Sequence, residues 1–294
     1  MPTTAGRKKG SPNDCNVQDA KLERVRAHIR SHHSALIAFS GGVDSSVVAM
    51  LAKQELGDAA VAVTVNNGAL HHGEPENAAA TAKAIGIRQL SIAFNPLTVS
   101  EIKHNDPERC YYCKKLTFST LRGLADELHL NTVMDGTNAS DLNVYRPGLR
   151  ALKELGVVSP LLGTTKDEVR SFARTLDLPN ASASSSACLF TSFPYGTIVT
   201  KKRIERLRQA ERTLQAIGIA RVKVRDHNGF ARIEIGKEDA TAVIKHSSAI
   251  AEAFFKLGFT YVTLDLEWLR SGSMDFALSS AKPNSSRHDE ISGR

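Results

Sequence analysis

The feature that most restricts the fold of this chain is a polar, glycine-containing loop between an apolar run and a helical pattern. Residues 35–39 are apolar, as in a short buried strand, and residues 47–56 have the pattern of a helix. The loop between them, residues 40–46, reads Ser-Gly-Gly-Val-Asp-Ser-Ser. Its glycines let the backbone approach a ligand closely, and the N–H groups and dipole of the following helix attract an anion. The loop therefore predicts a phosphate site, although it matches neither Gly-x-x-x-x-Gly-Lys-Ser/Thr nor Gly-x-Gly-x-x-Gly.

Strands and helices alternate along the first part of the chain. Further strand-like runs occupy residues 59–65, 88–94 and 132–135. Helical patterns occupy residues 17–32, 74–85 and 114–128. This spacing predicts an α/β fold, a doubly wound parallel sheet with helices on both faces. Ligands of such sheets bind at the carboxyl ends of the strands. Asp135, Thr137 and Asn138 follow the last of these strands, so we expect them to meet a nucleotide or a substrate.

The pattern changes near residue 199. A charged helical pattern at 201–217 precedes two alternating runs, and Asn228-Gly229 between those runs is a strong hairpin signal. Helical patterns over 238–257 and a strand at 261–266 complete a smaller α+β domain. We therefore expect four segments: a disordered segment at 1–16, a nucleotide-binding domain at 17–198, the α+β domain at 199–276 and a flexible tail at 277–294.

The composition is that of an ordinary globular protein, with 41% hydrophobic and 23% charged residues in a chain of 294. It excludes a wholly disordered, collagen-like or disulfide-framework protein. No apolar run approaches the roughly 20 residues of a membrane span. Four cysteines and a polar N-terminus without an apolar signal segment predict a cytoplasmic protein. The net charge of +7 suits a small anionic ligand as well as nucleic acid.

The loop at 40–46 resembles the pyrophosphate loop (PP-loop) of the ATP pyrophosphatase superfamily. The resemblance implies an adenine nucleotide alpha hydrolase-like sheet on which ATP transfers AMP to a substrate oxygen and releases pyrophosphate. The loop residues that it implies for the phosphates and Mg²⁺ are Ser40, Gly41, Gly42, Asp44, Ser45 and Ser46.

Later motifs narrow the resemblance to the LarE family of sulfur transferases. In chain order they are Asp106-Pro-Glu-Arg-Cys-Tyr-Tyr-Cys-Lys-Lys115, Asp135-Gly-Thr-Asn138, Arg146-Pro-Gly148, Ser159-Pro-Leu-Leu162, Thr165-Lys166 and Ala187-Cys-Leu189. The C-terminal segments at 222–225, 231–234 and 271–274 fit it too, so the resemblance covers about residues 17–275. It implies that ATP adenylylates a carboxylate of pyridinium-3,5-biscarboxylic acid mononucleotide and that sulfur then replaces AMP. The second carboxylate reacts in the same way, and the product goes on to receive nickel as the lactate racemase cofactor.

The cysteines decide where the sulfur comes from. Part of the family uses a single cysteine, at the position of Cys188, which gives up its own sulfur and is left as dehydroalanine. Another part carries three cysteines on a 4Fe-4S cluster whose open iron delivers a sulfide. Cys110, Cys113 and Cys188 match that set and predict the cluster. Cys-x-x-Cys also occurs as a redox pair, as half a zinc site completed by a histidine such as His104, or as two core thiols.

Further residues are assigned through the same resemblance. We expect Lys166 at the nucleotide, and Arg146, Arg225 and Arg232 at the substrate's phosphate or carboxylates, because arginine suits bidentate oxyanion contacts. Glu211 and Glu234 occupy family-like acidic positions, and we expect them at the substrate as well. The family commonly has an arginine just before Pro-Tyr-Gly, whereas this chain has Thr-Ser-Phe at 191–193.

Two other functions remain open from the sequence. An ATP-dependent tRNA thiolase uses the same loop and three cysteines, but no dense basic patch interleaved with aromatic residues favours nucleic acid. The second alternative is a protein that binds a nucleotide or an iron–sulfur cluster but catalyses no reaction. We expect a small-molecule substrate, no nucleic acid, no membrane and, through the family, a homo-oligomer.

Overall fold

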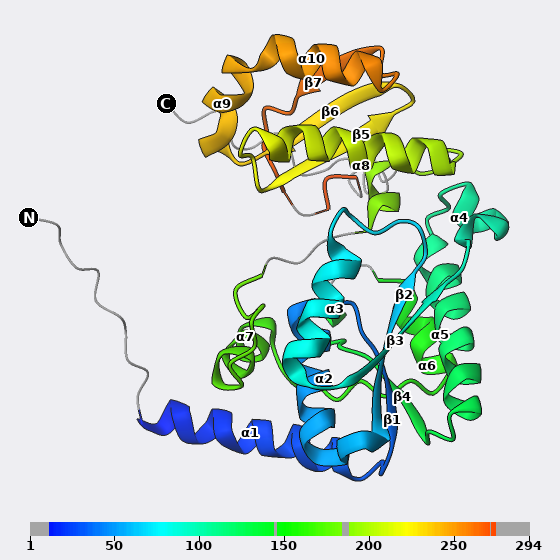
Figure 1. Ribbon diagram of the computed structural model, residues 1–294, viewed down its shortest axis with the longest axis vertical. Helices are drawn as coiled ribbons and strands as arrows, with labels where there is room; N and C mark the ends of the chain where they lie inside the picture. Colours follow the sequence, from blue (N-terminus) through cyan, green and yellow to red (C-terminus); the bar gives the residue numbers. More distant parts are fainter. Residues whose placement is uncertain (1–11, 144–145, 184–187, 271, 275–294) are drawn as a thin grey trace, which may run out of the picture. The chain divides into compact units, whose positions relative to one another are not determined.

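A parallel sheet of four strands organises the N-terminal part of the protein (Figure 1). The structure is a computed structural model that describes residues 12–143, 146–183, 188–270 and 272–274. The strands are β1 (Ala35–Ala38), β2 (Ala60–Asn66), β3 (Arg88–Ala93) and β4 (Thr132–Met134). They pair in the order β3-β2-β1-β4, so β1 and β2 lie inside the sheet. The carboxyl end of β1 leads into residues 40–46, which places the predicted phosphate loop at the strands' carboxyl edge.

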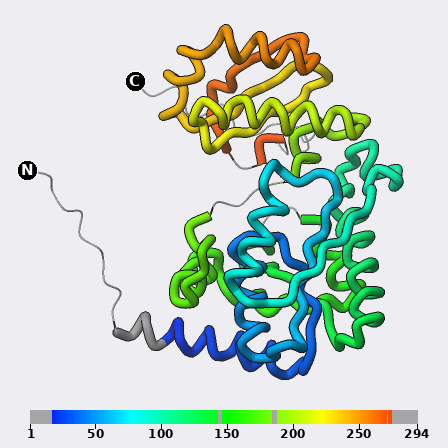
Figure 2. The backbone as a smooth tube through the Cα atoms, viewed as in Figure 1, coloured from blue at the N-terminus to red at the C-terminus, as the bar shows by residue number. Residues whose placement is uncertain are grey.

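Helices cover both faces of this sheet, which confirms the predicted α/β fold. The helices of this unit are α1 (Pro12–Arg30), α2 (Val43–Leu56), α3 (Glu74–Ile85), α4 (Ser100–Lys103), α5 (Arg109–Glu127), α6 (Gly148–Glu154) and α7 (Lys166–Thr175). Apolar residues of α1, α2, α3 and α7 share one core cluster, and those of α5 and α6 belong to another. The tube drawing shows the same two layers on either side of the strands (Figure 2).

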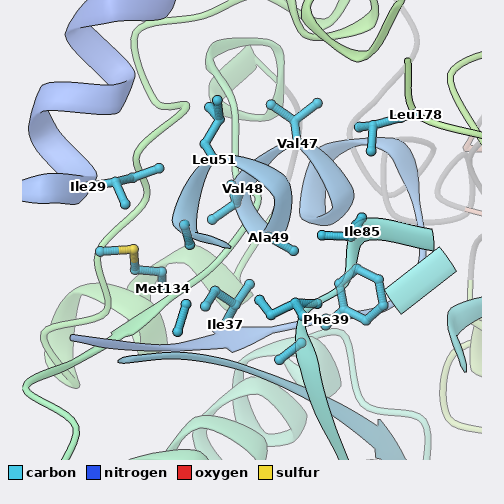
Figure 3. Packing of buried hydrophobic residues seen from close by; sticks show 14 of the residues in the cluster. Ile29, Ile37, Phe39, Val47, Val48, Ala49, Leu51, Ile85, Met134 and Leu178 are labelled. Atoms are coloured by element: carbon cyan, nitrogen blue, oxygen red, sulfur yellow. The ribbon is translucent and has the colours of Figure 1, made fainter. Parts of the chain in front are cut away.

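Alternation along β1 explains why the chain needs helices on both sides. Ile37 packs into the cluster of α2, whereas Leu36 packs into the cluster of α5. Figure 3 shows Ile37 and Met134 beneath Val48 and Ala49 of α2. Both faces of the strand are apolar because both are buried, as is usual in a parallel sheet.

A second compact unit contains the three-stranded sheet. The contacts divide the chain into residues 1–102 with 108–186, and residues 103–107 with 187–294. The second unit holds α8 (Lys201–Ala216), β5 (Val222–His227), β6 (Phe230–Ile235), α9 (Ala240–Lys245), α10 (Ser247–Lys256) and β7 (Tyr261–Leu264). β5 and β6 form the predicted hairpin, and β7 joins β6 in parallel. Asn228 and Gly229 both have positive φ, at 54° and 101°, as this two-residue turn requires.

Several helix boundaries differ from the sequence predictions. α1 begins at Pro12 rather than at residue 17, and α5 begins at Arg109 rather than at residue 114, so Cys110 and Cys113 are helical. α6 and α7 were not predicted as helices. Short 3-10 turns connect the elements: η1 (Gly57–Ala59), η2 (Pro96–Thr98), η3 (Ala139–Asn143), η4 (Leu189–Ser192) and η5 (Lys237–Asp239). Within the described ranges, no helix has both the length and the apolar character to cross a membrane.

Candidate functional site

The loop at 40–46 is held in shape by its own serine hydroxyls. Ser45 Oγ donates to the Gly42 carbonyl at 3.0 Å and lies 3.1 Å from Ser40 Oγ. The Gly42 N–H in turn donates to Ser40 Oγ at 3.3 Å. Gly42 is the N-cap of α2, and no side chain caps the helix. The first N–H groups of α2 are therefore available to an anion, which is the arrangement expected of a phosphate site.

Two glycines allow backbone segments to meet at this loop. Gly41 has φ +75°, and a Cβ built on it would lie 2.7 Å from the Cα of Ala78. A Cβ on Gly136, which follows β4, would lie 2.8 Å from the backbone nitrogen of Ser45. Backbone atoms cannot rotate away as a flexible side chain can, so the loop is packed between α3 and the segment after β4.

Opposite charges meet at Asp44 in the first turn of α2. The Lys166 ammonium forms an ion pair with the Asp44 carboxylate, and Asn138 Nδ2 donates to Asp44 Oδ1 at 3.4 Å. Lys166 opens α7, whose N-terminus is fixed by a capping box between Thr165 and Glu168. A carboxylate here suits Mg²⁺, and an ammonium suits a phosphate oxygen. The structure thus brings Asp44, Asn138 and Lys166 together.

Asp135 and Thr137 face each other. Asp135 is buried, and its carboxylate accepts hydrogen bonds from the Thr137 N–H at 3.2 Å, Thr137 Oγ1 at 2.5 Å and Ser159 Oγ at 2.6 Å. These contacts fix the turn that follows β4. The same turn places buried Asn138, whose N–H donates to Asp141 at 3.1 Å. Asp135 and Thr137 therefore support Asn138.

Arg146 is exposed and pairs with Asp141 at 3.0 Å. Asp141 lies in η3 and holds the Asn138 backbone, so Arg146 adjoins the turn after β4.

Cys110 and Cys113 lie near the start of α5, as its second and fifth residues. The Cys110 side chain is exposed, and Cys113 is half-buried with its sulfur 3.9 Å from Asn67 Nδ2. Burial, together with the nearby Cys110, raises the pKa of the Cys113 thiol. Positions three apart share a helix face, so the two side chains leave α5 on the same side.

Cys188 belongs to the second unit, is exposed, and directly precedes η4. Its carbonyl accepts the Thr191 N–H at 2.9 Å and Thr191 Oγ1 at 2.7 Å. Across the parts of the chain that the structure describes, no three His, Cys, Asp or Glu side chains gather closely enough to hold a metal ion.

The second unit contains a buried ionic network. Glu234, fully buried, accepts hydrogen bonds from Arg225 at 2.7 Å, Arg232 at 3.0 Å and Ser273 Oγ at 2.7 Å. Arg225 also donates to the Thr191 carbonyl at 3.0 Å, which joins the network to the turn that follows Cys188. Glu211 is buried nearby and accepts the Val224 N–H at 3.3 Å.

Two N–H donors of this network make no hydrogen bond to the residues that the structure describes. The Nε atoms of Arg225 and Arg232 are buried and have no hydrogen-bond partner within the described ranges. Burial, followed by the charge of Arg225, lowers the pKa of Lys223, and burial, followed by Arg232, lowers the pKa of His227. Both shifts are those expected of cationic groups that are buried and lie beside positive charges.

Sequence reasoning missed several contributors to these sites. Gly136, Ser159 and Ser273 all lie inside motifs of the family resemblance, but the resemblance implies no role for them. Asn180 donates to the Gly41 carbonyl at 2.7 Å and to Ser46 Oγ at 2.9 Å, and it lies in a segment without any recognisable signal for such a contact.

Comparison of the sequence with known proteins finds a matching family profile and several similar proteins. The asparagine synthase family profile matches residues 16–115, which include the loop at 40–46. The pyridinium-3,5-bisthiocarboxylic acid mononucleotide synthase of Lactiplantibacillus plantarum is 35% identical over 89% of this chain and 96% of its own length. An uncharacterised protein of Synechocystis is 39% identical over 88% of this chain and 98% of its own. A subunit of the glutamine-hydrolyzing GMP synthase of Methanocaldococcus jannaschii is 32% identical over 55% of this chain and 56% of its own.

The relative from Lactiplantibacillus spans nearly the whole chain, whereas the GMP synthase polypeptide shares about half of it. The resemblance deduced from the PP-loop, the cysteine motif and the C-terminal segments is thereby confirmed. With its uncapped loop on a doubly wound parallel sheet, the chain belongs to the LarE family of PP-loop, ATP-dependent sulfurtransferases.

Proposed function

We propose that this protein adenylylates the carboxylates of pyridinium-3,5-biscarboxylic acid mononucleotide and replaces carboxylate oxygen with sulfur, as a step towards a nickel-pincer (lactate racemase) cofactor. The observation that carries the proposal is the uncapped PP-loop in a chain that matches a pyridinium-3,5-bisthiocarboxylic acid mononucleotide synthase along 96% of that protein. A small-molecule nucleotide substrate agrees with the modest positive charge.

The chemical need for ATP follows from the leaving group. A carboxylate is a poor acyl donor because oxide or hydroxide would have to leave. A carboxylate oxygen attacks the α-phosphorus of ATP, the bond to the β-phosphate oxygen breaks, and pyrophosphate departs. The acyl group then carries AMP, which sulfur can displace. Loop N–H groups, together with Mg²⁺ when it is bound, would stabilise the negative charge that collects on pyrophosphate.

The residues divide between the two reactants. The loop at 40–46 would hold the phosphates, Asp44 would support Mg²⁺, and Lys166 would pair with a phosphate oxygen. Arg225 and Arg232 would hold the substrate's anionic groups, because each keeps an unpartnered buried Nε–H. Glu234 would keep those two guanidinium groups in place.

The sulfur is proposed to come from a 4Fe-4S cluster on Cys110, Cys113 and Cys188, with sacrificial loss of the Cys188 sulfur as the alternative. The exposed Cys110 and Cys188 and the helical spacing of Cys110 and Cys113 support thiolate ligation. These three thiolates would hold the cluster and would leave one iron without a protein ligand, where a sulfide could be added. The protein is further proposed to be cytoplasmic, as its small number of cysteines predicts, and, by family resemblance, a homo-oligomer.

Pyrophosphate release tests the proposed activity. The protein with Mg·ATP and the pyridinium dicarboxylate should release pyrophosphate, and nicotinamide mononucleotide, which carries an amide, should give none. Lys166→Met should lower the rate by about 10²-fold, as loss of one charge-stabilising donor does. Lys53→Met is the matched control, since Lys53 forms a similar pair with exposed Asp58 at 2.8 Å. Release that does not depend on the dicarboxylate would contradict the assignment.

A further inference from the structure

The segment that follows α7 is fixed against the start of α2. Leu178 is buried in the same core cluster as Val47, and Figure 3 shows it beside that residue. Its N–H donates to the Ala173 carbonyl at 3.0 Å, and its carbonyl accepts the Ala181 N–H at 3.1 Å. Anchored on both sides of its backbone, this turn carries Asn180 to the PP-loop.

The Asn180 amide bridges the two ends of the PP-loop. Nδ2 donates to the Gly41 carbonyl at 2.7 Å and to Ser46 Oγ at 2.9 Å. The carbonyl acceptor fixes the orientation of the amide, because a flipped amide would set oxygen against oxygen at Gly41. Asn180 therefore places its two N–H groups on two loop residues at once.

Two unmet hydrogen-bonding capacities point to a role beyond stability. Asn180 Oδ1 is buried and has no partner within the described part of the chain, which costs free energy. The Ser46 hydroxyl is buried and accepts from Asn180, so its own proton is left to donate elsewhere. Within the described residues, no protein acceptor is within hydrogen-bond reach of that proton. Ser46 lies in the first turn of α2, where an anion would accept it.

We propose that Asn180 is a positioning residue for ATP: its amide holds the Ser46 hydroxyl so that the O–H points to a phosphate oxygen. The bond to Gly41 serves to orient the amide. Asn180 does not itself touch the nucleotide. Its effect on ATP affinity passes through Ser46, which distinguishes it from residues that only brace the fold.

A double-mutant cycle on Mg·ATP affinity, measured by titration calorimetry, tests this inference. Asn180→Ala should weaken ATP binding about five- to tenfold in the otherwise unchanged protein, the effect of one or two lost hydrogen bonds. In a Ser46→Ala background, the same change should cost less than about twofold. Asn131→Ala is the matched control, because Asn131 Nδ2 donates to the His32 carbonyl at 2.9 Å at the amino edge of the sheet. It should leave the affinity unchanged.

Equal losses in the two backgrounds, or no loss for Asn180→Ala, would overturn the inference. If Asn180→Ala does not fold, Asn180→Leu keeps the size of the side chain and adds no charge while removing both donors, and its cycle with Ser46→Ala is read in the same way. The inference rests on the ATP-using half of the proposed function. If the protein binds ATP but releases no pyrophosphate that depends on the dicarboxylate, the proposed function is contradicted. The affinity test of Asn180 can still be carried out in that case.

Discussion

At the residue scale, the PP-loop depends on the absence of side chains as much as on their presence. Gly41 and Gly136 each bring one backbone segment onto another, and in both cases a Cβ would lie under 3 Å from main-chain atoms. Gly42, in contrast, would meet only Ser40 Oγ at 3.3 Å. The residue type at Gly41 and Gly136 is therefore restricted more tightly than at the serine positions of the loop.

Gly136→Ala should therefore disturb both stability and nucleotide binding. The added methyl group would overlap the Ser45 nitrogen, and overpacking of this kind costs about 1–3 kcal/mol. Thermal melting and Mg·ATP titration of the same preparation measure the two effects. Gly123→Ala in α5 is the control: nothing lies within 4 Å, so it should hold or raise the melting temperature. An unchanged melting temperature for Gly136→Ala would refute the close approach.

At the element scale, hydrophobic periodicity predicted the strands and most long helices because each buries a continuous apolar face. α3 was predicted with its observed bounds, residues 74–85. The signal was weaker at helix starts. α5 has no side-chain cap at Glu108, so nothing in the sequence marks its beginning before Cys110. The capping box of α7 has a sequence signature, Thr-x-x-Glu at 165–168, whereas the family resemblance rests on Thr165-Lys166 there.

The candidate sites were predictable to the extent that local motifs define them. The anion-binding loop follows from a strand, two glycines and a helix in succession, and the hairpin follows from Asn228-Gly229. Contacts made through the tertiary fold were not predictable. Asn180 reaches Gly41 across 139 positions in the chain, and Ser273 reaches Glu234 across 39. No periodicity in a single sequence encodes such a pair.

The β5–β6 hairpin is tied to α8 by one buried carboxylate. Asp226 accepts hydrogen bonds from Arg203 at 3.1 Å, from Arg206 and from the Gly229 N–H at 2.9 Å, and its side chain is fully buried. Burial alone would raise the pKa of Asp226, but the contacts with Arg203, Gly229 and Arg206 hold that pKa below its ordinary value. The ionised form is the one that stabilises the hairpin.

The pH dependence of this tie has a definite sign. A carboxyl group with a depressed folded-state pKa contributes stability above its unfolded pKa of about 4, and that contribution is lost as the pH falls through the lower, folded value. Asp226→Asn leaves two arginines without their counter-charge and should cost about 3–5 kcal/mol near neutral pH. Its melting temperature should also fall less steeply below pH 4. Asp58→Asn, at an exposed ion pair, should have the same melting temperatures as the unmodified protein. If the melting temperature of Asp226→Asn falls as steeply below pH 4 as that of the unmodified protein, this account is contradicted.

At the scale of the whole molecule, the proposed 4Fe-4S cluster predicts the colour and the iron content of the protein. Anaerobically prepared protein should be brown and hold about four irons per chain, as a 4Fe-4S cluster requires. Cys110→Ser should lose the iron and the colour, whereas Cys15→Ser, at a thiol outside the proposed set, should keep both. Metal analysis and absorption spectra provide the measurement. Colourless anaerobic protein whose Cys188 is lighter by one H₂S after turnover would replace the cluster with the sacrificial route.

The two units are also interleaved along the chain, since residues 103–107 belong with the C-terminal unit. Buried Asn105 donates to the carbonyls of Phe193 and Pro194, both at 2.9 Å, and its own carbonyl accepts the Gly196 N–H at 3.2 Å. The polypeptide therefore passes between the units three times. Dividing the chain at a single point after residue 186 would separate Asn105 from Phe193, Pro194 and Gly196. The C-terminal fragment would then lack part of its own unit and would not be a complete module for fusion, exchange or separate expression.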